Sequence, residues 1–352
     1  MKRFAIITGL LSGFLFGIAT PFSKLLLDGL NSFQLAGLLY LGAALAMLPY
    51  LFRKNSNLML LFHKGNRAKT IGIIFFGGFL GPVLLLAGLK TAYAASVSIW
   101  LNMELVATAI LGVLIFKDSL DRNAWIGVGL TIVAGIVTAF GEGSSGIISA
   151  LLITAACISW AVDNHLTALT DGASPQSVTF LKGIVAGSVN LLLGCLFASQ
   201  PLTFGYVGPA LIVGIFSYGF SIMLYVTSAQ NLGATRGQIL FSTAPLWGVV
   251  LSYIFYHESF QWVHVISILL LALAVIITYM LSHKHLHTHI AMEHLHYHQH
   301  SDGHHDHAHE SEWIPSAKWH YHSHTHHPLT HEHPHYPDLH HRHSHEKPTP
   351  NL

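Results

Sequence analysis

Residues 93–116 read YAASVSIWLNMELVATAILGVLIF, in which Glu104 is the one charged residue. A helix needs about 20 apolar residues to cross a hydrocarbon core about 30 Å thick, and this stretch is long enough. Backbone amides in lipid find no water, so they must be satisfied inside the segment. The stretch therefore predicts a membrane-spanning α-helix.

Nine further apolar stretches accompany it along the chain. The 352 residues are 52% hydrophobic and only 9% charged, whereas soluble domains hold about 25% charged residues. This composition excludes an ordinary soluble enzyme. We predict an all-α integral membrane protein with ten transmembrane helices, followed by a disordered tail. The predicted spans are 4–22, 33–52, 70–88, 93–116, 123–140, 147–168, 177–197, 207–229, 236–256 and 262–281.

Basic residues indicate the orientation, because they concentrate on the cytoplasmic side of membrane proteins. They precede the first predicted span and fill the links from the second to the third and from the fourth to the fifth. An even number of spans then returns the chain to the same side. We expect a multi-pass protein of the cell (plasma or inner) membrane with both termini cytoplasmic. The residues are Lys2, Arg3, Arg53, Lys54, Lys64, Arg67, Lys69, Lys117 and Arg122.

An internal repeat relates the two halves at an offset of 140 residues. Residues 116–120 (FKDSL) align with 256–260 (YHESF), so an acidic residue follows the same span in each half. Each half has five spans, which is an odd number, so the second copy must insert upside down. Inverted repeats with a site between them are a transporter architecture. The predicted units are residues 4–140, 147–281 and a tail at 282–352.

Several short motifs resemble the EamA family of the drug/metabolite transporter superfamily. They are Phe16-Gly17 to Lys24, residues 101–105 (LNMEL), the acid-Ser-apolar turn after that span, Gly127 to Gly135, Trp160, Pro245 and residues 258–260 (ESF). The resemblance covers about residues 4–281. It implies two inverted five-helix repeats around a cavity that opens alternately to each side, and small organic solutes as cargo, often exported amino acids or metabolites. Three departures are Leu105 for Pro, Asp118 for Glu, and Ser267 where the first repeat has Gly127.

No catalytic motif stands in a suitable context. The sequence lacks a Walker A motif, and we find no usable GxSxG, HExxH or GxGxxG. We therefore expect no enzyme activity, no required cofactor and no nucleic-acid partner. The expected function is secondary transport of a small solute through the lipid bilayer, driven by a proton or another coupling ion.

Glu104 is the deepest acid in the predicted spans, and Asn102 lies beside it. An ionised side chain at mid-span costs roughly 2.5–3.5 kcal/mol on insertion scales. One interpretation is a carboxyl group that faces the cavity and binds the solute or the coupling proton. The other is a neutral Glu that is hydrogen-bonded for packing.

Four more residues are candidates for the transport pathway: Lys24, Trp160, Asp163 and His165. Residues two apart point about 200° apart on a helix, so Asp163 and His165 do not easily hold one metal. Lining of the cavity and interfacial placement remain alternatives for them. Lys24 is a candidate because the resemblance to the EamA family places a lysine at this position. Lys182, near a predicted span end, is interpreted as a lysine that reaches to the membrane surface.

The tail, residues 282–352, holds 24 of the 28 histidines, mostly alternating with other residues. It has few apolar residues to bury, which predicts disorder. Alternate residues of an extended chain share a side, and neutral imidazoles bind Zn, Ni, Co and Cu. The histidines predicted to bind divalent metal are His283, His285, His287, His289, His294, His296, His298, His300, His304, His305, His307, His309, His320, His322, His324 and His326.

Other functions for the tail stay open. Histidine titrates near pH 6.5, so the tail could also respond to pH at the anionic inner leaflet. Two alternatives for the whole protein are a divalent transition-metal transporter and a membrane-anchored metal buffer or sensor. The spans argue against metal transport, because none has two His or Asp at a three- or four-residue spacing.

Overall fold

The structure is a computed structural model of the whole chain. It describes residues 2–51, 58–116, 122–141, 143–168, 170, 174–197, 201–232, 240–241, 243–255, 261–280, 285–289, 292–298, 320–326 and 329–333.

The described secondary-structure elements of the first half are all helical, and short turns join them. Its elements are α1 (Lys2–Gly17), α2 (Ala19–Leu26), α3 (Ser32–Leu51), the 3₁₀ turn η1 (Leu58–Phe62), α4 (Lys64–Gly72), the π-helix η2 (Ile73–Leu80), α5 (Gly81–Leu89), α6 (Ala94–Trp100), α7 (Met103–Phe116) and α8 (Arg122–Gly141). The elements α4, η2 and α5 follow one another without a gap.

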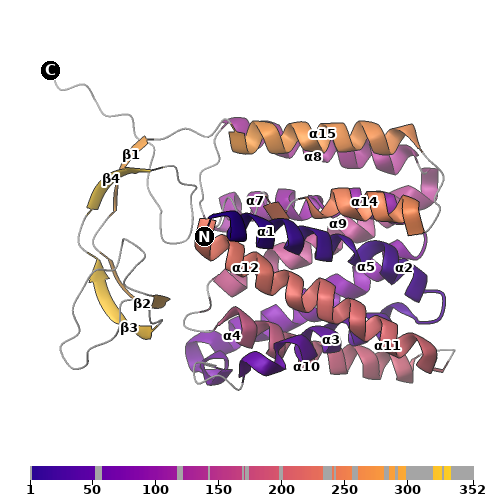
Figure 1. Cartoon of the computed structure of the whole chain (residues 1–352), viewed down its shortest axis with the longest axis horizontal. Helices are drawn as coiled ribbons and strands as arrows, with labels where there is room; N and C mark the ends of the chain where they lie inside the picture. Colours follow the sequence, from indigo (N-terminus) through magenta and orange to yellow (C-terminus); the bar gives the residue numbers. More distant parts are fainter. Residues whose placement is uncertain are drawn as a thin grey trace.

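The second half has the same kinds of element in the same order. They are α9 (Gly143–Ala168), α10 (Pro175–Leu196), α11 (Phe204–Val213), the π-helix η3 (Gly214–Phe220), α12 (Ser221–Leu232), α14 (Ala244–Phe255) and α15 (Trp262–Met280). Figure 1 shows the helices of both halves running along one common direction, with α8 and α15 together at one edge.

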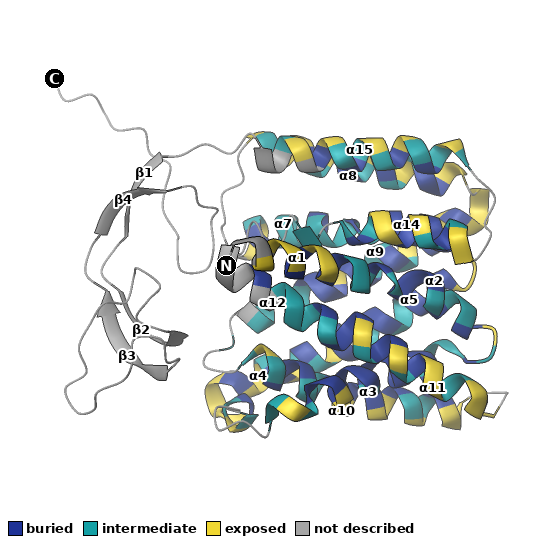
Figure 2. Cartoon of the chain, in the orientation of Figure 1, coloured by how far each residue is buried: buried dark blue, intermediate teal, exposed yellow. Residues whose placement is uncertain are grey.

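The helices are long and apolar enough for a membrane. Seven helical stretches among the described residues meet the length and hydropathy of a full span, and three shorter apolar helices lie at 125–141, 244–255 and 262–274. Figure 2 shows exposed residues on helices throughout the body, and many of the exposed residues are large and apolar. Phe140, Leu151 and Leu192 are examples, at 72%, 66% and 59% exposed. A continuous apolar exterior of this kind is the surface that lipid covers.

The two halves pack against each other in matched pairs. α3 contacts α10, and α8 contacts α15, so equivalent helices of the two halves lie side by side. α1 contacts both α12 and α14, just as α9 contacts both α5 and α7. In the repeat, α1 corresponds to α9, α12 to α5 and α14 to α7, so the two sets of contacts are equivalent. This is the packing expected from a duplicated unit.

Glycines on α1 make this packing close. A Cβ added to Gly9, Gly13 or Gly17 would lie 2.6 Å from an atom of Ser228, Thr243 or Ala244, respectively. Real Cβ contacts that short do not occur, so the bare backbone of α1 permits the approach of α12 and α14. The four-residue glycine repeat is a helix-packing face, as small residues often are in membranes.

Two π-helices occupy equivalent places. η2 lies in the third helical pass of the first half and η3 in that of the second, and the 140-residue offset superimposes 74–80 on 214–220. π-helical turns are rare and occur often at functional sites. The repeat therefore extends from the sequence to a detail of backbone geometry.

The tail contains strands, which corrects the expectation of disorder for the segments described. β1 (His285–His289) pairs with β4 (Leu329–His333), and β2 (Met292–His298) pairs with β3 (His320–His326), both antiparallel. The period-two sequence is compatible with strands, because alternate residues of a strand lie on the same face. His283, His300, His304, His305, His307 and His309 lie outside the described residues.

Candidate functional site

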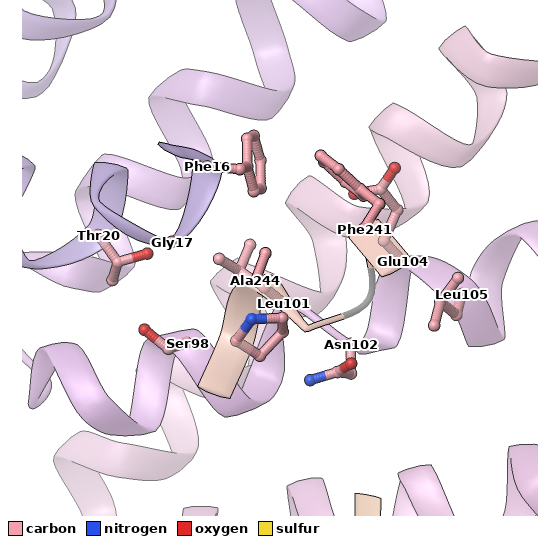
Figure 3. A pocket seen from close by; sticks show the side chains of 11 residues that line it. Phe16, Gly17, Thr20, Ser98, Leu101, Asn102, Glu104, Leu105, Phe241 and Ala244 are labelled. Atoms are coloured by element: carbon pink, nitrogen blue, oxygen red, sulfur yellow. The ribbon is translucent and has the colours of Figure 1, made fainter. Parts of the chain in front are cut away.

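A cavity of about 60 Å³ lies where the two halves meet. A single water needs only about 10–15 Å³ of such space, so the cavity has room for several waters or a small solute. Its wall is largely apolar with a few polar groups, and Figure 3 shows Thr20 and Ser98 on one side of it and Glu104 on the other. The lining residues are Phe16, Gly17, Thr20, Ser98, Leu101, Asn102, Glu104, Leu105, Phe241, Ala244 and Pro245.

Interrupted helices form this cavity. The chain passes from α1 to α2 at Ile18 and from α6 to α7 at Leu101 and Asn102, and α14 begins at Ala244. All three places contribute to the wall. Ala244 is the 140-residue equivalent of Glu104, so both α7 and α14 begin at the cavity at matched positions. Discontinuous helices in this arrangement build the solute and ion sites of transporters.

Glu104 is half-buried in the first turn of α7 and is held from α9. Asn164 Nδ2 donates a hydrogen bond of 2.8 Å to Glu104 Oε1. Asn102 is 7% exposed, and its Nδ2 donates to the backbone oxygen of Ile99 at 3.1 Å. Among the described residues that line the cavity, Glu104 is the one ionisable side chain. This described wall thus presents a single carboxyl group among apolar and hydroxyl-bearing side chains.

The other predicted pathway residues lie elsewhere. Lys24 Nζ donates to the backbone oxygen of Ala92, in the link between α5 and α6. His165 Nδ1 lies 2.7 Å from the backbone oxygen of Ala161, one turn earlier in its own helix. Trp160 Nε1 donates to the backbone oxygen of Gly77 at 3.1 Å. None of the three lines the cavity that the structure describes.

Asp163 is 4% exposed and pairs with Lys182, at 2.7 Å between Oδ2 and Nζ. Its place in the sequence predicts that Lys182 reaches to the membrane surface. The structure shows instead that Lys182 binds Asp163 inside the helical body. Its side chain is 14% exposed and turned inward, because the carboxylate of α9 offers a partner that water would otherwise supply. Asp163 and His165 face different partners and do not converge on one ion.

Sequence reasoning missed the apolar part of the cavity wall. Phe16 belongs to one of the motifs that resemble the EamA family, but no role at a site was assigned to it, and Phe241 looks like any other apolar residue of a span. One signal was present, since the repeat aligned 242–245 with the stretch that contains Asn102 and Glu104. Applying the repeat to the site would have placed Ala244 and Pro245 beside Glu104.

The described residues show no metal centre in the helical body. No group of three or more His, Cys, Asp or Glu there is placed to hold a metal ion. Three cross-strand positions of β2 and β3 carry histidine on both strands: 294 with 324, 296 with 322, and 298 with 320. β1 and β4 add 285 with 333 and 287 with 331.

One family of known proteins matches each half of the helical body separately. The model of the EamA-like transporter family matches residues 3–140 and again residues 147–280. The two matches correspond to the two predicted repeats and confirm the resemblance drawn from the short motifs.

Two curated relatives match about half of this chain at low identity. An uncharacterized transporter of Methanothermobacter thermautotrophicus is 28% identical over 199 residues, which cover 53% of this chain and 57% of that protein. The uncharacterized transporter YyaM of Bacillus subtilis is 23% identical over 198 residues, covering 52% of this chain and 63% of its own length. The chain thus spans somewhat more than half the length of the relatives it matches. A crystal structure that is 16% identical superposes with a TM-score of 0.56, covering 79% of this chain and 96% of the other, and this likeness shows the fold alone.

Proposed function

The chain belongs to the EamA-like transporter family, and from this premise we propose that it is a gradient-driven carrier of a small organic solute, a metabolite or amino acid that it exports. The observation that supports this most is the cavity between the halves, with one carboxyl group among apolar and hydroxyl side chains. Such a wall suits a solute with an apolar body and one or two polar groups.

The proposed carrier has ten helices in two inverted repeats. The three shorter apolar helices complete the seven longer ones, and the paired packing of the halves supports a two-fold relation between them. Both termini are then cytoplasmic in the cell membrane, in agreement with the distribution of basic residues. Rocking of one half against the other opens the cavity to each side in turn.

Glu104 is the proposed binding group for the solute or the coupling proton. It is the ionisable side chain of the cavity wall, and Asn164 fixes one of its oxygens. Carboxyl groups inside membranes mark proton and solute pathways. Asn102, the neighbouring polar residue of the wall, is proposed to orient the solute. Lys24, Asp163, His165 and Trp160 lie outside the described wall, and we propose that they take part in the pathway in another state of the carrier.

Proteoliposomes that contain the purified protein and the trapped pH dye pyranine test the proposal. Each of the twenty amino acids is added in turn, and the internal pH and the uptake of labelled solute are followed. We expect Glu104→Gln to lower both signals at least about tenfold, the effect of losing one strong polar contact to the transported species. Asp28→Asn is the matched control, because Asp28 is exposed after α2 and away from the cavity.

Two outcomes contradict the proposal in different ways. Full flux with unchanged pH dependence in Glu104→Gln removes Glu104 from the pathway but leaves the carrier. A folded wild-type protein that moves none of the solutes and no protons, with metal bound at the tail, favours the membrane-anchored sensor instead.

For the tail we propose binding of divalent transition metal. Directly opposed positions in an antiparallel pair place Cβ atoms about 5 Å apart, and the register sets histidine against histidine at five such positions. Two opposed neutral imidazoles suit one Zn, Ni, Co or Cu ion. Transport of metal through the helical body has no support in the described residues, which hold no cluster of ligands there.

Equilibrium dialysis of the full-length protein against Ni²⁺ tests the tail. Gln at His320, His322 and His324 removes one strand of the opposed pairs and is expected to abolish the tightest Ni²⁺ sites. Gln at His304, His305 and His307 is the control with the same number of histidines removed. Equal losses in the two variants mean that the register of the strands plays no part.

A further inference from the structure

A buried ion pair lies inside the helical body, outside the cavity wall. Lys182 Nζ of α10 and Asp163 Oδ2 of α9 are 2.7 Å apart, and the side chains are 14% and 5% exposed. Thr167 Oγ1 donates to the second carboxylate oxygen, Oδ1, at 3.3 Å. Charges are expensive inside a membrane, and a buried pair is by itself weak evidence for a gain in stability.

The buried ion pair rests directly on the π-helix η2. A Cβ on Gly77 would collide with the Asp163 carboxylate, of which even the farthest atom, Oδ1, would be 2.7 Å away. A Cβ on Gly78 would lie 2.9 Å from Lys182 Cγ. Both glycines are buried in η2. The pair therefore covers bare backbone at the one place in this pass where the helix is widened.

Side chains from three helices bind the backbone oxygens of η2. Gly77 O accepts from Tyr40 of α3 at 2.5 Å and from Trp160 of α9 at 3.1 Å. Gly78 O accepts from Asn190 of α10 at 3.0 Å. A π-turn displaces carbonyl groups from their usual partners, and these donors replace them. The π-geometry of η2 is thus tied to the present positions of α3, α9 and α10.

The equivalent positions beside the π-helix η3 carry no charge. The 140-residue offset places Ser23 where the first set has Asp163, and Gly42 where it has Lys182. Ser217 stands at the equivalent of Gly77. The hydroxyl groups of Ser23 and Ser217 are buried and have no hydrogen-bond partner among the described residues. The two π-helices, η2 and η3, thus occupy equivalent places in the repeat, but charged side chains lie only beside η2 at these positions.

The buried ion pair also communicates with the cavity. Asn164, which follows Asp163 on α9, donates to Glu104 Oε1 at 2.8 Å. Glu104 lies within electrostatic reach of both Asp163 and Lys182. Asp163 and Asn164 are neighbours on α9. A movement of α9 over η2 that separates the ion pair therefore also changes the position of Asn164 relative to Glu104.

We propose that Asp163 and Lys182 are positioning residues of the transport cycle that hold η2 against α9 and α10 in one carrier state, so that the two openings of the cavity are unequal in energy. The proposal rests on the carrier function above. In the state opposite to the one described, α9 slides over η2 and the pair separates. η3, with Ser23 and Gly42 at the equivalent positions, moves at its end without this restraint.

Accessibility of the cavity from each side tests the proposal. Cys157 and Cys195 are replaced by Ala in the full-length protein, and Thr20→Cys places one thiol in the cavity wall. A membrane-impermeant trimethylammonium methanethiosulfonate is applied to right-side-out and inside-out vesicles. The ratio of the two labelling rates measures how the carrier divides its time between its states.

We expect Asp163→Asn with Lys182→Met to raise labelling from the slower side about tenfold relative to the faster side, because the described state loses its restraint. The control is Thr138→Val with Ser267→Ala. It removes another buried contact between helices, 2.8 Å long, from α8 and α15. A ratio that changes no more than in this control overturns the proposal.

A milder variant guards against misfolding. Thr167→Val removes only the 3.3 Å hydrogen bond to Asp163, and we expect a smaller change of the ratio in the same direction. An unchanged ratio in this folded variant also contradicts the proposal. Absence of labelling from both sides in every variant instead refutes the alternating cavity itself, and the role of the ion pair with it.

Discussion

Replacement of Gly77 by Ala is a direct test of the contact between η2 and the buried ion pair. The added methyl group would overlap the Asp163 carboxylate, whose more distant oxygen would be 2.7 Å away where ordinary contact begins at 3.4 Å. The carboxylate must therefore retreat by more than half an ångström. We expect this displacement to break the 2.7 Å contact between Asp163 and Lys182.

The expected loss of stability has two parts. Overpacking of a close-packed interior costs about 1–3 kcal/mol, and loss of a charged hydrogen bond costs about 1.5–3 kcal/mol. We expect Gly77→Ala to lower the free energy of unfolding by roughly 3–5 kcal/mol. Unfolding by sodium dodecyl sulfate in dodecyl maltoside micelles, followed by tryptophan fluorescence, measures it.

A control and a rescue sharpen this test. Gly129→Ala adds the same methyl group in α8, where nothing lies within 4 Å of it, and should stabilise by about 0.5–1 kcal/mol. Asp163→Ala with Lys182→Met removes the obstacle and both charges, so Gly77→Ala should cost little on that background. Equal stability of the Gly77 and Gly129 variants, or full additivity with the background, would refute the reasoning.

Two further predictions concern polar contacts between helices. His264 is 1% exposed, and Ser96 Oγ and Tyr253 OH each lie 2.7 Å from one of its ring nitrogens; His264→Leu removes both hydrogen bonds and should cost about 2–4 kcal/mol, measured by the same unfolding assay. Trp100→Phe removes a 3.0 Å hydrogen bond from Nε1 to a backbone oxygen of α8 and should cost about 1 kcal/mol. Trp125→Phe is its control, since Trp125 is 46% exposed, and an equal cost in both tryptophan variants would contradict the assignment.

The helical passes could be predicted from the sequence because uninterrupted apolar composition decides them. The break at Leu101 and Asn102 could not, since the apolar stretch 93–116 continues across it. The π-helices were equally hidden. The displaced carbonyls of η2 are satisfied by Tyr40, Trp160 and Asn190, which come from helices distant in the sequence. Hydropathy does not record such donors.

Some residues of the candidate site could likewise be predicted from the sequence, and others could not. Glu104 and Asn102 could be found because polar groups inside an apolar stretch are costly and therefore conspicuous. Phe241 could not, because its place in the cavity wall comes from its position in the fold alone. Lys182 was misread for a related reason. It lies near the predicted end of a span, and only the fold shows that Asp163 on the preceding helix faces it.

The π-turns of η2 also bear on the rotation of α5, the next helix along the chain. A π-segment holds an extra residue within one wider turn, whereas a residue added to a regular α-helix turns everything beyond it by about 100°. Deleting one residue within 73–80 would therefore let the segment wind as a regular α-helix while α5 keeps its rotation. Leu85, Leu86 and Leu89, which are buried in the present register, would then stay buried. The third pass can thus change between wide and regular winding at this segment without changing the face that it turns toward the other half.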